Sequence, residues 1–75
     1  MHVLDLKIGD TAKITCYQEG FAHYRKRLLV MGLTPGTSFK VLQIAPLGDP
    51  IAILVRGTTL TLRKKEASIL NIEAV

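Results

Sequence analysis

The side chains that could bind a metal ion or transfer a proton are scattered along this chain. They are His2, Asp5, Asp10, Cys16, Glu19, His23, Asp49, Glu66 and Glu73. Metal sites usually include a pair of ligands at short spacing, such as Cys-x-x-Cys, and no such pair occurs here. His23 would share a helix face with Glu19 only if a helix began near Glu19, which Gly20 disfavours. The sequence therefore predicts no metal site and no cofactor.

Nothing in the sequence indicates catalysis either. An enzyme needs a nucleophile beside a base, or a pair of carboxylates in a cleft, and neither appears as a motif. A glycine-rich phosphate-binding loop followed by lysine is also absent. We predict that the chain is not an enzyme and has no catalytic residue.

Length and composition indicate a single small domain, residues 1–75, in a reducing compartment. A chain of this size buries only about 60% of the surface of its unfolded form, which leaves little room for a deep cleft. The single cysteine excludes an internal disulfide and a four-cysteine zinc site. No apolar run approaches the ~18 residues of a membrane-spanning helix, and the first residues do not resemble a secretory signal. We expect a cytoplasmic location.

Basic residues form two short runs, Arg25–Arg27 and Arg63–Lys65, in a chain of net charge +4. They are either ordinary solvated charges or an electropositive face for an acidic partner or for lipid headgroups. Nucleic acid is an alternative ligand. The four aromatic residues are not interleaved with the basic runs, so a base-stacking platform is not expected.

The first basic run lies on a predicted helix. Apolar residues at helical spacing line one face of it; they are Phe21, Tyr24, Leu28 and Met31. Val30 lies on the opposite side and is expected to be exposed. Gly32 is expected to close the helix in a left-handed conformation, with Leu33 touching Leu28 across a Schellman-type cap.

The remaining chain predicts five short strands, at 12–17, 38–44, 51–56, 59–63 and 70–74, because apolar and polar residues alternate there. A tight turn at 56–58 predicts a hairpin, and Lys64–Ala67 fits one helical turn. Cys16 falls on the apolar side of its strand and is predicted to be in the core. The pattern indicates an all-β fold with one short inserted helix, either a small antiparallel barrel or a sandwich.

The loop 45–50 is the most interesting candidate for partner contact. Leu47 lies between turn-forming residues, where burial is hard to arrange. Nearly half of the chain, 48%, is hydrophobic, so an exposed apolar patch is expected. This patch would combine Leu47 with Val30, Leu42, Ile44 and Leu54. The candidate partner-binding residues are Arg25, Lys26, Val30, Leu47, Gly48, Asp49 and Leu54.

Three separated blocks of sequence resemble one known family. They are Arg27-Leu28-Leu29-Val30-Met31-Gly32-Leu33-Thr34-Pro35-Gly36, Ala45-Pro46-Leu47-Gly48-Asp49-Pro50-Ile51 and Leu62-Arg63-Lys64-Lys65-Glu66-Ala67. In this order and spacing they are similar to ferrous iron transport protein A (FeoA), over nearly the whole chain. The resemblance implies a five-stranded SH3-like barrel. It also implies a cytoplasmic accessory of the ferrous iron permease FeoB, attached to the inner membrane only through that partner.

On this resemblance we expect the chain to dock to FeoB and to modulate its transport or GTPase cycle by protein–protein interaction. A related barrel occurs in iron-dependent repressors, so a regulatory domain that responds to metal or nucleic acid is the alternative. Only one helix of any length is predicted here, which disfavours a DNA-binding helix-turn-helix. An open sheet edge would also permit weak self-association.

Overall fold

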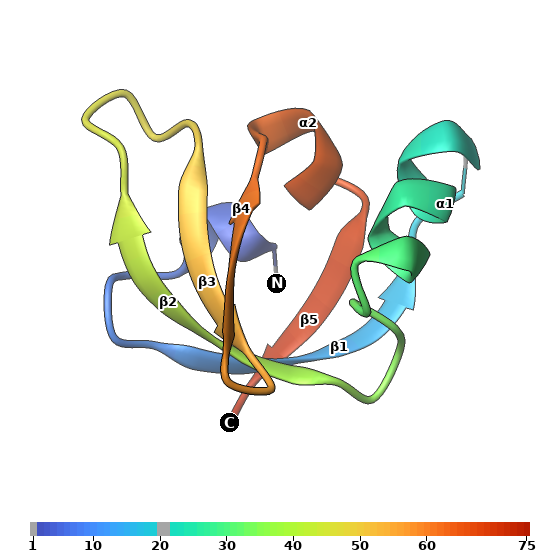
Figure 1. Cartoon of the computed structure of the whole chain (residues 1–75), viewed down its shortest axis with the longest axis horizontal. Helices are drawn as coiled ribbons and strands as arrows, with labels where there is room; N and C mark the ends of the chain where they lie inside the picture. Colours follow the sequence, from blue (N-terminus) through green and yellow to red (C-terminus); the bar gives the residue numbers. More distant parts are fainter. Residues whose placement is uncertain (1, 20–21) are drawn as a thin grey trace.

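The computed structural model describes residues 2–19 and 22–75, and its main feature is one antiparallel sheet (Figure 1). The strands are β1 (Thr11–Tyr17), β2 (Ser38–Ile44), β3 (Ile51–Val55), β4 (Thr58–Leu62) and β5 (Leu70–Ala74). A 3-10 turn, η1 (Val3–Asp5), precedes β1, and two helices, α1 (Ala22–Val30) and α2 (Lys64–Ala67), follow β1 and β4. The predicted all-β fold with a short inserted helix is confirmed. Gly20 and Phe21, the latter predicted on the apolar face of the helix, lie outside the described residues.

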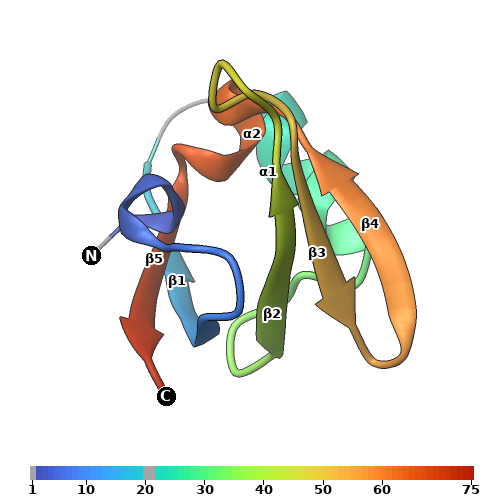
Figure 2. The same ribbon diagram turned by 90° about the vertical axis from the view of Figure 1, so that its left-hand side faces the viewer.

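The sheet bends around its own core. Its order is β4-β3-β2-β1-β5, and Figure 2 shows β1 and β5 facing β2, β3 and β4 across the interior. Among the described residues β4 and β5 do not pair, so the barrel is open between them, and α2 carries the chain from one edge to the other (Figure 1). No helix in the described part of the chain is long and apolar enough to span a bilayer.

The β3–β4 hairpin forms as the sequence predicts. Arg56 and Gly57 both have positive φ, 51° and 80°, the requirement of a two-residue type I′ turn. Ile51, Ile53 and Val55 are buried, because they share the inner face of β3.

The predicted helix cap is also confirmed. Gly32 has φ of 85°, and its N–H donates to the Leu29 carbonyl at 3.1 Å. The N–H of Leu33 donates to the Leu28 carbonyl at 2.9 Å, which completes a Schellman motif. Leu28 and Leu33 are both fully buried. The cap therefore anchors the end of α1 to the core.

Two predictions based on strand alternation are wrong, and a bulge explains each. Cys16 is exposed rather than buried, because the pairing of β1 with β5 shifts between Ile14 and Cys16 and turns Cys16 outward. In β2 the register shifts between Val41 and Gln43. Ile44 consequently packs against the core instead of joining an outer patch. One extra residue in a strand reverses which side chains face inward beyond it.

The start of the chain also differs from simple alternation. Val3 and Leu6 are buried while Leu4 and Ile8 are exposed. A spacing of three residues suits the 3-10 turn, whose buried side chain is Val3. This turn covers one end of the barrel next to β5, where His2 forms a bridge with Asn71.

Candidate partner-binding surfaces

The two basic runs, far apart in sequence, meet at one end of the barrel. Helices α1 and α2 lie side by side there (Figure 1). Arg25, Lys26 and Arg27 belong to α1, while Arg63 precedes α2 and Lys64 and Lys65 begin it. All six are exposed. We call this region the basic end.

A buried carboxylate joins the two helices. Glu66 is only 4% exposed, and its Oε2 pairs with Nε of Arg27 at 2.5 Å. Its Oε1 accepts a hydrogen bond from the backbone N–H of Arg63 at 3.0 Å, as in a helix capping box. Glu66 is one of the candidate metal ligands in the sequence, but both of its carboxylate oxygens have partners and link α1 to α2. The arrangement also fixes the orientation of Arg27, whose side chain remains 66% exposed.

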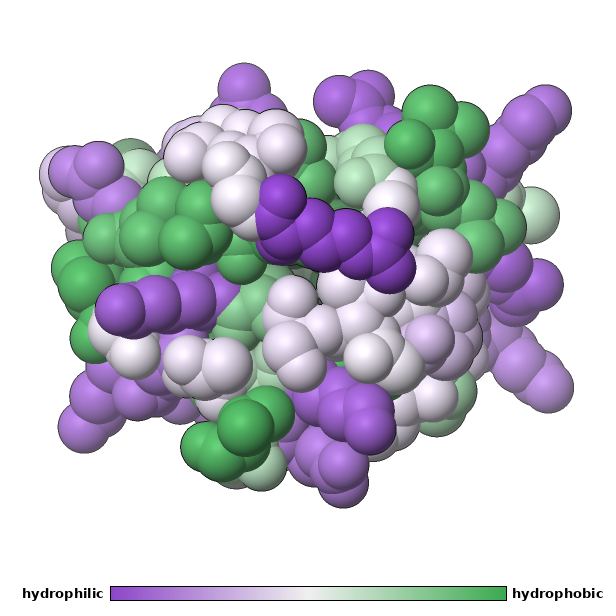
Figure 3. All heavy atoms as spheres, turned by 60° about the horizontal axis from the view of Figure 1, so that its bottom comes forward, coloured by the Kyte–Doolittle hydropathy of each residue, from purple (hydrophilic) through white to green (hydrophobic). Residues whose placement is uncertain are grey.

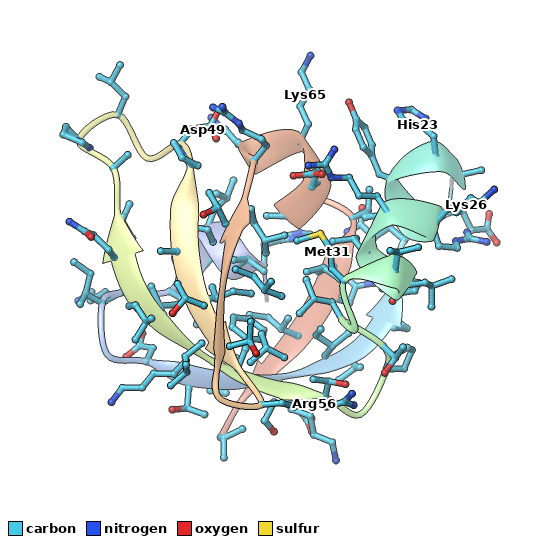
Figure 4. All side chains as sticks on the ribbon, viewed as in Figure 1. His23, Lys26, Met31, Asp49, Arg56 and Lys65 are labelled. Atoms are coloured by element: carbon cyan, nitrogen blue, oxygen red, sulfur yellow. The ribbon has the colours of Figure 1, made fainter. Side chains whose placement is uncertain are left out.

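An open groove of about 610 Å³ runs along α1, and we call it the α1 groove. Its lining residues are His23, Lys26, Arg27, Val30 and Met31. Val30 is 82% exposed, as predicted. In Figure 4 the side chains of His23 and Lys26 project away from the body of the protein, whereas Met31 points toward the interior. The groove therefore combines apolar side chains, Val30 and Met31, with basic ones, Lys26 and Arg27.

The second candidate surface lies around the loop between β2 and β3, and we call it the loop surface. Leu47 is 94% exposed at its tip, and Leu42 and Leu54 lie on the outer side of β2 and β3. Below the loop is a groove of about 300 Å³. It is lined by Gln43, Ala45, Pro46, Pro50, Ile51, Ala52 and Thr61.

Asp49 has a structural role that its sequence position did not reveal. Its Oδ1 accepts a hydrogen bond from the backbone N–H of Lys64 at 3.0 Å. That N–H is in the first turn of α2, where helix donors lack intrahelical partners. Asp49 therefore ties the loop to α2, while Gly48 provides the positive φ of 80° that the turn requires.

The predicted partner-binding residues fall into two groups rather than one. Arg25, Lys26 and Val30 belong to α1, and the others to the loop surface, and these elements lie on opposite sides of Figure 1 with α2 and β4 between them. The labelled side chains of Lys26 and Asp49 show this separation in Figure 4. In the view of Figure 3 the apolar side chains form separate patches divided by hydrophilic ones. The expected single patch joining Val30 to Leu47 does not form.

The remaining candidate ligands are also dispersed. Among residues 2–19 and 22–75 no three His, Cys, Asp or Glu side chains gather as a metal site would require. Asp5 and Asp10 each accept a backbone hydrogen bond, from His2 at 3.1 Å and from Lys7 at 2.8 Å. Cys16 Sγ contacts Nδ2 of Asn71 at 3.3 Å.

The structure is that of a small open barrel with charged and apolar side chains on two exposed surfaces. A family model described as the FeoA domain matches residues 1–74, and the chain belongs to this family. The family assignment agrees with the prediction that this chain is not an enzyme.

Similar proteins support the assignment. The chain is 35% identical over 75 residues to a Porphyromonas gingivalis protein described as an Fe(2+) transport protein A/Fe(2+) transporter FeoB fusion protein. All of this chain is covered, but it spans only 9% of that relative. The FeoA protein of Chlorobium tepidum is 40% identical, with a TM-score of 0.85 over all of this chain and 70% of that one.

A second solved structure bears on the fold alone. Stenotrophomonas maltophilia FeoA, solved with zinc and described as an SH3 domain protein, has a TM-score of 0.81. The match covers 97% of this chain and 89% of that one, and the two sequences are 22% identical. The predicted SH3-like fold is confirmed.

Proposed function

We propose that this chain is an accessory domain of ferrous iron uptake that docks to a FeoB-type permease. The supporting observation is the Porphyromonas gingivalis relative, in which a similar domain belongs to one polypeptide described as a fusion with FeoB. Fusion keeps two binding partners at a high effective concentration. The domain is then located at the cytoplasmic face of the membrane through its partner, and ferrous iron is the cargo of that partner.

Docking changes the permease only if the domain prefers one of its conformational states. A binding partner shifts an equilibrium by its difference in affinity for the two states, and a tenfold difference corresponds to about 1.4 kcal/mol. The proposed contacts are Leu47, Gly48, Asp49 and Leu54 on the loop surface and Arg25, Lys26 and Val30 on α1. The domain acts in this way without any catalytic group of its own.

The experiment is a binding assay between the purified domain and the detergent-solubilised permease, with and without a GTP analogue. We expect binding whose affinity depends on the bound nucleotide. Absence of binding in every nucleotide state would contradict the proposal.

The loop surface is tested by Leu47→Asp. Because Leu47 is 94% exposed, we expect this variant to melt as cooperatively as the wild type and to bind the permease at least about tenfold more weakly, since it places a charge at an apolar contact. Ile8→Asp is the matched control, because Ile8 is also exposed, at 61%, and lies in the turn before β1. Equal loss of binding in both variants would show that the effect is not specific to the loop.

A further inference from the structure

We propose that the α1 groove receives an acidic, amphipathic segment of the permease, with an apolar side chain seated between Val30 and Met31. This inference rests on the proposed function and adds the chemistry of the docking segment and the place where it binds. Three features of the basic end support it: its charge, its shape and the fixed position of Arg27.

The net charge of the chain is concentrated at the basic end. Six of the ten Lys and Arg residues lie there, together with one acidic residue, Glu66, which is already hydrogen-bonded. Elsewhere in the chain five acidic residues outnumber four basic ones. A concentrated positive potential attracts acidic partners and disfavours basic ones.

The direction of the groove suits a helical peptide segment. Its lining residues, from His23 to Met31, recur every three or four positions, so the groove follows the helix axis. Nine residues of α helix are about 13 Å long, enough to contact roughly two turns of a partner helix. An apolar side chain of a partner helix can pack against Val30 and Met31 on this shallow, open surface.

Arg27 is already oriented for a carboxylate. Its Nε pairs with Glu66. Its two terminal Nη groups form no hydrogen bond with any residue that the structure describes, so they can donate to a partner. An arginine held in one orientation loses less side-chain entropy when it binds. Its planar guanidinium then donates strong, directional hydrogen bonds to an acidic side chain.

The test uses the full chain and the detergent-solubilised permease. We expect Lys26→Glu and Val30→Asp each to weaken binding at least about tenfold, and Lys26→Glu to reduce the dependence of the affinity on salt. Lys13→Glu is the matched control for charge, because Lys13 is an exposed residue of β1 outside the groove, and it should change the affinity less than threefold. Thermal melting of each variant verifies that it is folded.

The outcomes separate this inference from the proposed function. If Lys26→Glu and Val30→Asp both bound the permease with the affinity of the wild type, the inference would be wrong and docking to the permease would stand. Absence of wild-type binding in every nucleotide state would overturn both. The rival occupant is an anionic membrane, tested by sedimentation with phosphatidylglycerol and phosphatidylcholine vesicles. If Lys26→Glu abolished sedimentation with the anionic vesicles but left permease binding unchanged, the groove would be a lipid site and the inference wrong.

Discussion

Tyr17 connects the end of β1 to the cap of α1. Its hydroxyl donates a hydrogen bond to the backbone carbonyl of Leu33, and its ring packs against the core. Burial raises the pKa of Tyr17, and the positive charge of Arg25 partly opposes this increase. The phenol therefore remains a neutral donor at physiological pH.

Replacing Tyr17 by Phe should lower the free energy of unfolding by about 1 kcal/mol at neutral pH, because the Leu33 carbonyl loses its donor. The raised pKa in the folded state means that the tyrosine stabilises fully below its unfolded pKa of about 10 and loses this contribution as the pH rises further. Urea unfolding at pH 8 and pH 11 measures both effects. We expect the difference between wild type and Tyr17→Phe to shrink at the higher pH, and a constant difference would contradict this explanation.

Single residues also show where sequence reasoning stops. From the sequence alone, Glu66 is a candidate metal ligand and Asp49 a candidate partner-binding residue. In the structure both accept hydrogen bonds from backbone N–H groups at the start of α2. Glu66 lies three residues after its partner Arg63, a spacing typical of a capping box that could have been recognised. The bond from Lys64 to Asp49 spans fifteen residues and depends on the path of the loop, so no local pattern predicts it.

At the scale of elements, the end of α1 depends on one glycine. A methyl group at Gly32 would meet only Nη1 of Arg56, at 4.0 Å, so space is available. The φ of 85° is nevertheless unfavourable for any residue with a side chain.

We therefore predict that Gly32→Ala lowers the free energy of unfolding by about 1 kcal/mol through backbone strain alone. In a domain of this size that corresponds to a melting temperature lower by about 4–8 °C. Val30→Ala, an exposed substitution near the same helix end, is the control and should shift the melting temperature little. An unchanged melting temperature for Gly32→Ala would show that the cap contributes nothing to stability.

The predictable elements are those with a local cause. The Gly32 cap and the turn at Arg56 follow from backbone preferences of a few residues, and both were predicted. The orientations of Cys16 and Ile44 were not, because each depends on a bulge that arises from pairing with a neighbouring strand. Alternation predicts the inner face of a strand only as far as its first bulge.

At the scale of the whole molecule, the two candidate surfaces lie on opposite sides of the barrel (Figure 1). The meeting of the two basic runs at one end was not predictable, because it depends on how the sheet bends. The separation of Leu47 from Val30 has the same cause.

We predict that the effects of Leu47→Asp and Lys26→Glu on the free energy of unfolding are additive. Residues that share no neighbours usually behave independently, within about 0.5 kcal/mol. Urea unfolding of the two single variants and the double variant measures this. A larger deviation would indicate that the loop and α1 communicate through α2, which contacts both.

The pairing of β1 with β5 has a consequence for the order of folding. Ala12 pairs with Ala74 and Tyr17 with Leu70, so the first strand is completed only by the last. Such distant pairings must close nearly the whole chain into a loop, which makes folding comparatively slow. During synthesis, β1 can pair with β2, but its other edge stays unpaired until β5 has left the ribosome. Where such a domain begins a longer polypeptide, the segment that follows it is already being made before the barrel can assemble.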